Sequence, residues 1–264
     1  MKNKEYLKLM AEWMEYTRIK DNGQSEVTGK ELDFWLQCVK ESNGPVLELG
    51  CGTGYILISL LKHGIDISGL DTSSFMMERC RNKCKEMGLK PTLYDQPMQD
   101  FKIPKTFGLI IAGSGNLSLL IHDKDIDSTF GCVRNHLKPG GLFVVEFEQV
   151  TENKKKWKNQ WSGNWFQGAN GAIYAHRQIF KDLPDNPNIW ECFLIIEKYV
   201  DGKLIETEGN QRIGRFFTVK EVVQFLKQAG FEDIKTTNWQ SNDPPSKDAN
   251  TITVRCRKPI NKID

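Results

Sequence analysis

Short apolar runs alternate with amphipathic segments between residues 45 and 148. The apolar runs are five to seven residues long, are rich in β-branched side chains and predict strands at 45–50, 65–71, 91–95, 107–113 and 142–148. The segments between them have helical spacing and predict helices at 55–63, 73–87 and 123–137. Repeated strand–helix units with nearly continuous apolar strands indicate a parallel sheet with helices on both faces.

The chain on either side of this region extends the same pattern. Two helices are predicted at 5–20 and 30–42 from apolar residues at helical spacing. Thr218 and Glu221 form a capping-box pattern for a further helix that Gly230 ends. Two last strands follow, at 231–239 and 251–258. The predicted fold is α/β: a doubly wound, mostly parallel seven-stranded sheet with an antiparallel strand at one edge.

Residues 149–217 interrupt the alternation of strands and helices. The part up to residue 171 predicts a loop or partial lid, and three strand-like runs at 172–180, 190–200 and 203–217 predict an antiparallel meander. The chain is therefore predicted to divide into N-terminal helices (1–42), an α/β domain (43–148 and 218–258) and a β-rich insert (149–217).

The composition restricts the class of protein. The 264 residues carry a formal net charge of +2, which does not indicate a dedicated nucleic-acid binder. Seven cysteines without a C-x-x-C pair indicate neither a disulfide framework nor a metal site, and they favour a reducing, cytoplasmic location. No apolar run reaches membrane-spanning length, and the first residues do not resemble a secretory signal.

A glycine-rich turn, VLELGCGTG (46–54), lies between the first predicted strand of the sheet and the next helix. Glycine adopts positive φ and has no Cβ, so a ligand can lie against the backbone. Asp71 ends the second predicted strand, where a carboxylate can accept hydrogen bonds from two ribose hydroxyls. The two features together predict a site for an adenosine-containing ligand.

The spacing of the glycines and one acidic residue favour a particular ligand. Dinucleotide-binding turns have G-x-G-x-x-G spacing around a pyrophosphate, whereas this chain has G-x-G-x-G. Glu48, inside the first strand, would repel a pyrophosphate and attract an α-ammonium group. S-adenosylmethionine, which carries adenine, ribose and an amino-acid zwitterion, fits both facts. An NAD-dependent oxidoreductase is the rival interpretation.

Four segments in the same order resemble the motifs of class I S-adenosylmethionine-dependent methyltransferases. They are ELGCGTG (48–54), GLDTSSFMMERC (69–80), HLKPGGLFVVEFE (136–148) and FFTVKEVVQFLKQAGFEDI (216–234). The similarity spans roughly residues 28–258 and is of the kind found in small-molecule enzymes with a β-rich insert after the fifth strand.

The resemblance implies a role for particular residues. Glu48 would face the methionine amino group, Asp71 would bind the ribose, and Ala112 would offer its carbonyl near the amine. The remaining cofactor-binding residues implied are Gly50, Cys51 and Gly52 along the backbone, and Thr72, Met76 and Met98 around adenine. Pro97 departs from the family pattern, which often has Asp there for the adenine amino group; Gln96 and Gln99 are the alternatives.

The methyl acceptor is less strongly indicated. The predicted function is transfer of a methyl group to nitrogen or oxygen of a small molecule; transfer to RNA or protein, and a non-catalytic cofactor-binding protein, are the alternatives. The substrate candidates are Asn116, Trp165, Tyr174 and His176, with His176 the best of several poor candidates for a base. Tyr174 and His176 share one strand face, which faces either the acceptor or solvent and a partner subunit, so a homodimer through the insert stays open.

Overall fold

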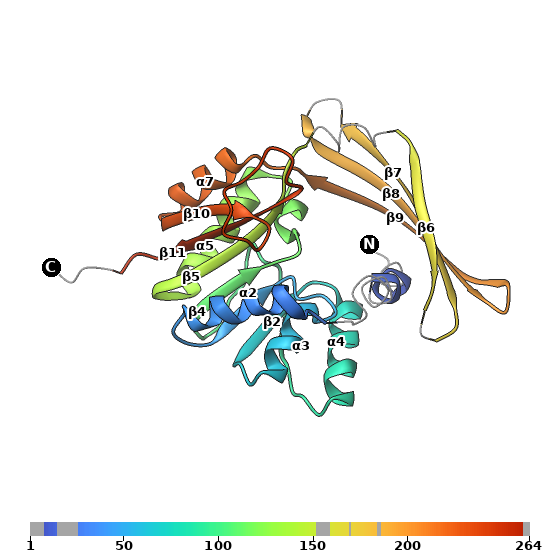
Figure 1. Cartoon of the computed structure of the whole chain (residues 1–264), viewed down its shortest axis with the longest axis horizontal. Coiled ribbons are helices and arrows are strands. Elements are labelled where there is room, and N and C mark those ends of the chain that lie inside the picture. The colour runs from blue at the N-terminus through green and yellow to red at the C-terminus, as the bar shows by residue number, and fades with distance from the viewer. Residues whose placement is uncertain (1–7, 15–25, 152–158, 169, 184–185, 261–264) are drawn as a thin grey trace.

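The structure is a computed structural model in which residues 8–14, 26–151, 159–168, 170–183 and 186–260 are described. Figure 1 shows two β-sheets at opposite ends of the molecule, with the helical segment 8–14 between them. Of the N-terminal helix predicted at 5–20, residues 5–7 and 15–20 lie outside the described residues.

The larger sheet has seven strands in the order β10-β11-β5-β4-β1-β2-β3. Their bounds are β1 Val46–Leu49, β2 Ile67–Asp71, β3 Thr92–Asp95, β4 Phe107–Ala112, β5 Leu137–Glu148, β10 Glu232–Asn238 and β11 Thr251–Arg257. The mostly parallel α/β sheet is confirmed. The predicted place of the antiparallel strand is wrong, because β11 lies between β5 and β10 and pairs antiparallel with both. The loop after β10 turns the chain back, and β11 fills the space between them.

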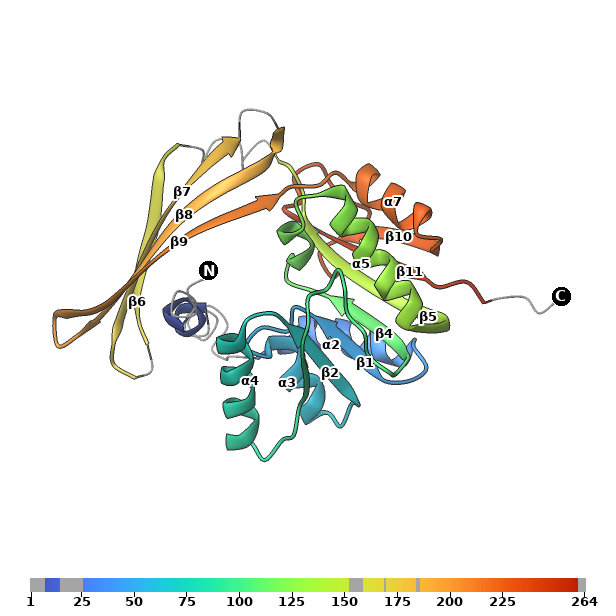
Figure 2. The ribbon, with the colours of Figure 1, turned by 180° about the vertical axis from the view of Figure 1, so that it is seen from behind.

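Helices cover both faces of this sheet, as Figure 2 shows from behind. They are α2 Gly29–Lys40, α3 Tyr55–Lys62, α4 Ser74–Glu86, α5 Asp123–His136 and α7 Val219–Gln228, with the short 3₁₀ helix η2 at Asn116–Leu119. One buried cluster joins α5 and α7 to the sheet through side chains such as Phe130 and Leu226. A second cluster packs α2, α3 and α4 on the other face, with Trp35 and Leu57 at its centre.

Local signals place most helix ends. The capping box of α7 is present, with Thr218 Oγ1 accepting the Glu221 N–H and the Glu221 carboxylate accepting the Thr218 N–H. The helix predicted at 123–137 ends at His136, and β5 starts at Leu137, earlier than predicted. The sequence Lys138–Gly141 stops the helix as expected but continues directly into the strand, with Gly140 at φ 73°.

The insert is a four-stranded antiparallel sheet in the order β6-β7-β8-β9. Its strands are β6 Trp161–Gln167, β7 Ile173–Leu183, β8 Asn186–Val200 and β9 Lys203–Arg215. The meander is confirmed, but the loop predicted up to residue 171 is wrong over β6. The sequence of β6 mixes aromatic residues, which favour strands, with Ser, Gly and Asn, which favour turns. Its backbone pairs with β7 from Trp161↔Ile179 to Gln167↔Ile173.

One face of the insert holds the helical segment 8–14, which Figures 1 and 2 place between the two sheets. Leu9 and Met10 join a buried cluster with Tyr174 of β7 and Leu194 of β8. Glu208 of β9 accepts the backbone N–H of Leu9 at 2.9 Å. The insert therefore lies over the α/β domain with a helical segment fixed beneath it. Within the described residues, no helix is both long and apolar enough to cross a membrane.

Candidate active site

The glycine-rich turn connects β1 to α3 in a conformation that requires glycine. Gly50, Gly52 and Gly54 have φ values of 66°, 53° and 85°. A Cβ on Gly54 would lie 2.6 Å from the sulfur of Cys80, whereas a Cβ on Gly52 would meet nothing within 4 Å. The turn is therefore tightly packed on its α4 side and open at Gly52, where it borders a cavity.

Asp71 fixes the end of β2 to this turn. Its two carboxylate oxygens accept the backbone N–H groups of Gly52 at 2.9 Å and Ser73 at 2.8 Å. Burial raises the pKa of Asp71, and these two hydrogen bonds act in the opposite direction. Each oxygen keeps a further lone pair, so the side chain can still accept hydrogen bonds from a ligand in the cavity.

Asn116, at the start of η2, holds the other side of the turn. Its Nδ2 donates to the carbonyl oxygens of Leu49 at 3.2 Å and Gly50 at 2.9 Å. A Cβ on Gly50 would lie 2.6 Å from this nitrogen. Asn116 thus fastens the segment after β4 to the segment after β1.

Glu146 of β5 supports the same segment from inside the protein. Its Oε2 accepts the backbone N–H of Ser114 at 2.8 Å, and its Oε1 accepts from Gln240 at 3.0 Å. Gln240 also donates to Glu31, which accepts the hydroxyl of Tyr55. Burial, with a smaller contribution from the charge of Glu31, raises the pKa of Glu146 to about 7. Ser114 has φ 56°, so this buried network maintains an unusual backbone conformation at the cavity wall.

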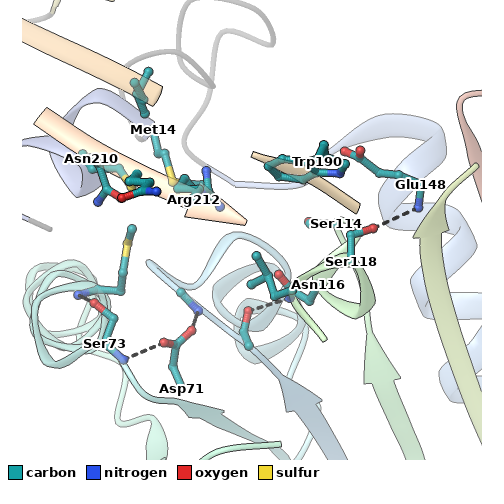
Figure 3. A pocket seen from close by; sticks show the side chains of 18 of the residues that line it. Met14, Asp71, Ser73, Ser114, Asn116, Ser118, Glu148, Trp190, Asn210 and Arg212 are labelled. Carbon is teal, nitrogen blue, oxygen red and sulfur yellow. Dashed lines mark hydrogen bonds between the residues drawn. The ribbon is translucent and has the colours of Figure 1, made fainter. Parts of the chain in front are cut away.

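A cavity of about 1270 Å³ separates the two sheets. Its floor consists of the carboxyl ends of β1, β2, β4 and β5, with Glu48, Asp71, Ser114 and Glu148. Its roof consists of the insert and segment 8–14. The roof residues include Met10, Met14, Phe180, Trp190, Asn210 and Arg212. Figure 3 shows Asn210 and Arg212 on one side of the cavity and Asp71 and Ser73 on the other.

Comparison with known proteins agrees with this geometry. Residues 46–141 match the family model described as a methyltransferase domain. The solved structure of an S-adenosylmethionine-dependent methyltransferase from Clostridium acetobutylicum ATCC 824 has a TM-score of 0.76 at 22% identity, covering 92% of this chain and 97% of that one. Residues 46–141 therefore form a methyltransferase domain, and the chain has the fold of class I S-adenosylmethionine-dependent methyltransferases.

Two curated relatives agree with that assignment. YqeM of Bacillus subtilis (strain 168), which carries the name of a methyltransferase, is 23% identical over 245 residues, 92% of this chain and 96% of its own. The dTDP-3-amino-3,4,6-trideoxy-alpha-D-glucopyranose N,N-dimethyltransferase of Streptomyces venezuelae is 28% identical over 101 residues, 38% of this chain and 41% of its own.

The floor of the methyltransferase cavity fits its cofactor, S-adenosylmethionine. Glu48 is 4% exposed and lines the cavity at the end of β1, where a carboxylate suits an ammonium group and not a pyrophosphate. Asp71 lies on the neighbouring strand, and the open space at Gly52 leaves room between them. Burial raises the pKa of the Cys51 thiol well above its ordinary value, which disfavours the thiolate form that a nucleophile requires.

The structure brings most of the predicted cofactor residues together. The cavity-lining ones are Glu48, Gly50, Cys51, Gly52, Asp71, Thr72 and Met76. Ala112 is buried within β4, and Met98 packs against the buried core; neither is among the residues that line the cavity, and the backbone contacts predicted for both stay predictions. Gln96 is bonded to the backbone of Lys102 through both of its side-chain polar atoms.

Only one of the four predicted substrate residues, Asn116, lines the cavity. Tyr174 is fully buried against segment 8–14 and donates to Glu12 at 2.9 Å. The ring of His176 contacts that of Trp13 in a tilted arrangement, with 4.7 Å between the ring centroids, and burial lowers the pKa of His176. Trp165 is on the opposite face of the insert and is 66% exposed. The face of β7 expected to meet the acceptor meets the N-terminal segment instead.

Other residues that line the acceptor side were not predicted as site residues. Glu148 is the last residue of β5, as Asp71 is the last residue of β2, and both line the cavity. Its position at the carboxyl end of a strand could therefore have predicted it as a site residue. Ser118 Oγ lies 3.4 Å from the Glu148 backbone nitrogen and accepts its N–H. Arg212 and Trp190 had no such signal, because their approach depends on how the insert folds back.

Proposed function

We propose that this methyltransferase transfers a methyl group to a nitrogen or oxygen atom of a small molecule bound between the floor and the roof. The supporting observation is the cavity, whose volume of about 1270 Å³ exceeds the roughly 300–1,000 Å³ typical of a single small-molecule pocket. A cavity of that size has room for the cofactor and a second compound.

The floor residues have distinct roles in this proposal. Bound S-adenosylmethionine supplies an electrophilic methyl group on its sulfonium. Glu48 attracts the α-ammonium group, Asp71 accepts the ribose hydroxyls, and Thr72 and Met76 flank adenine. Asn116 and Glu146 keep the surrounding turns in place, so that little reorganisation is needed on binding.

Glu148 is the proposed proton acceptor, replacing His176 in that role. It lines the cavity at the end of β5, beside Ser118 of η2 and near the turn that presents Ser114. An amine or hydroxyl acceptor arrives protonated, and a carboxylate within reach can hold or remove that proton. Positioning of the acceptor supplies the rest of the rate gain.

A small-molecule acceptor is supported by the roof that covers the cavity, and by the name of the Streptomyces venezuelae relative, which gives that enzyme an amino sugar linked to dTDP. A homodimer through the insert remains part of the proposal, supported by Trp161 and Trp165 on β6, which are 56% and 66% exposed. A cytoplasmic location is supported by the seven free cysteines.

The test is a transfer assay with methyl-labelled S-adenosylmethionine and separate pools of small amines, small hydroxyl compounds, RNA and protein. Label should enter a small-molecule pool, and Glu148→Gln should lower kcat about 100-fold with little change in the affinity for the cofactor. Glu197→Gln, which removes a partner of Arg177 in the insert, is the control. Label in RNA or protein alone would refute the proposed acceptor class.

A further inference from the structure

Arg212 is a cation in the roof of the cavity, on the side opposite the floor carboxylates. Along β9 the even-numbered residues Glu208, Asn210 and Arg212 are buried or partly buried, whereas their odd-numbered neighbours are exposed. Glu208 accepts the N–H of Leu9, which shows that this face is turned toward segment 8–14. Arg212 therefore lies on the inner face of the insert, and it lines the cavity.

The other two arginines on the strands of the insert are paired with acids. Arg177 contacts Glu197 at 3.4 Å, and Arg215 contacts both Asp123 and Glu221. Arg212 has neither an ion pair nor a side-chain hydrogen bond with any residue in the described part of the chain, and the same holds for Asn210, two residues before it. A partly buried guanidinium loses hydration, and a counter-ion is the usual compensation.

The two walls of the cavity differ in charge. The floor presents the carboxylates of Glu48, Asp71 and Glu148, and the roof presents the cations Arg212 and Lys181. No ion pair joins Arg212 to these acids in the described residues, so the cation is available to a ligand. A guanidinium with a neighbouring amide can bind a carboxylate or phosphate through several parallel hydrogen bonds.

We propose that Arg212 and Asn210 form a subsite for an anionic group, a carboxylate or phosphate, on the methyl acceptor. This inference rests on the proposed function, because it assumes a small molecule in the cavity. The cofactor also has a carboxylate, but the N-terminus of α3 lies in the floor beside Glu48, where a helix terminus favours negative charge. Arg212 is thus left for the second ligand, and the acceptor class is an anionic amine or alcohol.

The first experiment measures anion binding to the complex of the enzyme with S-adenosylhomocysteine. Inorganic pyrophosphate and malonate are titrated calorimetrically into wild type, Arg212→Gln and Arg177→Gln. Wild type and Arg177→Gln should bind at least one probe with equal affinity, and Arg212→Gln should bind it about tenfold more weakly or worse. Equal binding by all three proteins, or no binding of either probe by wild type, would overturn the subsite.

The second experiment identifies the source of the anion. S-adenosylhomocysteine, which has the carboxylate, and 5′-methylthioadenosine, which lacks it, are titrated into wild type and Arg212→Gln. The subsite predicts no change in either affinity on substitution. Tenfold weaker binding of S-adenosylhomocysteine alone would assign Arg212 to the cofactor and overturn the proposal.

These measurements separate failure of the subsite from failure of the proposed function. If wild type does not bind S-adenosylhomocysteine at all, the methyl-transfer proposal fails first. If it binds and only the anion probes give no difference, the subsite alone fails. Melting temperatures of the three proteins within about 2 °C exclude unfolding as the cause, since removing one partly exposed cation costs little stability.

Discussion

The floor of the cavity is fixed by side chains that bind its main chain, whereas the roof is fixed mainly by bonds between side chains, apart from the bond from the Leu9 N–H to Glu208. In the floor, Asp71 and Asn116 bind main-chain groups of the glycine-rich turn, and Glu146 binds the main chain of Ser114. In the roof, Tyr174 and Lys198 bind the side chain of Glu12. The bonds to the main chain of the floor leave little freedom for substitution, so the floor suits a cofactor that is the same in every reaction. The roof is a surface of side chains, and these can differ between enzymes with different acceptors.

Replacing a glycine by a bulky residue should give the largest difference in stability between the floor and the roof. Gly54→Val places a β-branched side chain at φ 85° and within 3 Å of Cys80 and Ile58, which should cost roughly 3 kcal/mol or more. Gly171→Val, in the turn between β6 and β7, has φ 79° but open space, and should cost about 1–2 kcal/mol. Urea unfolding measures both. Equal losses of unfolding free energy would mean that the glycine-rich turn is no more tightly packed than the turn at Gly171.

The buried carboxyl group of Glu146 should give the floor a pH dependence. Its pKa is raised from 4.5 to about 7, so the native state binds a proton that the unfolded state releases, and stability falls as pH rises through that window. Glu146→Gln should remove this fall, which corresponds to roughly 3 kcal/mol. The measurement compares unfolding free energies of both proteins at pH 5 and pH 8; parallel curves would contradict the assignment.

Loss of the Asn116 amide should make the glycine-rich turn less rigidly held without creating a cavity in the hydrophobic core. Asn116→Ala loses the two hydrogen bonds to Leu49 and Gly50, which should cost about 1–2 kcal/mol of stability and weaken S-adenosylhomocysteine binding several-fold. The matched control in the roof is Asn164→Ala, which loses an exposed bond to His176. Calorimetry should show no change for this control, and an equal change in both would remove the distinction.

The smallest effects are expected in the roof. Tyr174→Phe loses the hydrogen bond to Glu12 and should cost about 1 kcal/mol, with kcat unchanged within twofold. His176→Ala should likewise leave kcat unchanged, because the ring contacts that of Trp13 and does not line the cavity. A 100-fold loss of kcat in either variant would restore the catalytic role first predicted for that face of β7.

The difference between floor and roof also decides what the sequence could predict. Most strands of the main sheet follow from short apolar runs, and the turn with Glu48 and Asp71 follows from local residue types at strand ends. Alternation along β7 correctly indicated that Tyr174 and His176 share a face, since both meet segment 8–14. The contact partner could not be predicted, because Glu12 is 162 residues away in the chain.

Two further differences have the same physical origin. β6 pairs with β7 along its whole length although its sequence was predicted as a loop, and β11 lies between β5 and β10 and pairs antiparallel with both. Arg212 reaches the cavity because β9 folds back over the α/β domain. Each of these features depends on contacts between distant segments, which local patterns do not encode.

Calorimetric titration with S-adenosylhomocysteine tests the central claim, that the floor is a site for S-adenosylmethionine, most directly. Wild type should bind one equivalent with micromolar affinity, and NADH should give no heat of binding. Asp71→Ala should weaken the complex by about 1.5–3 kcal/mol, as expected for lost hydrogen bonds to a charged group. Binding of NADH but not of S-adenosylhomocysteine, or an Asp71→Ala affinity equal to that of wild type, would contradict the account.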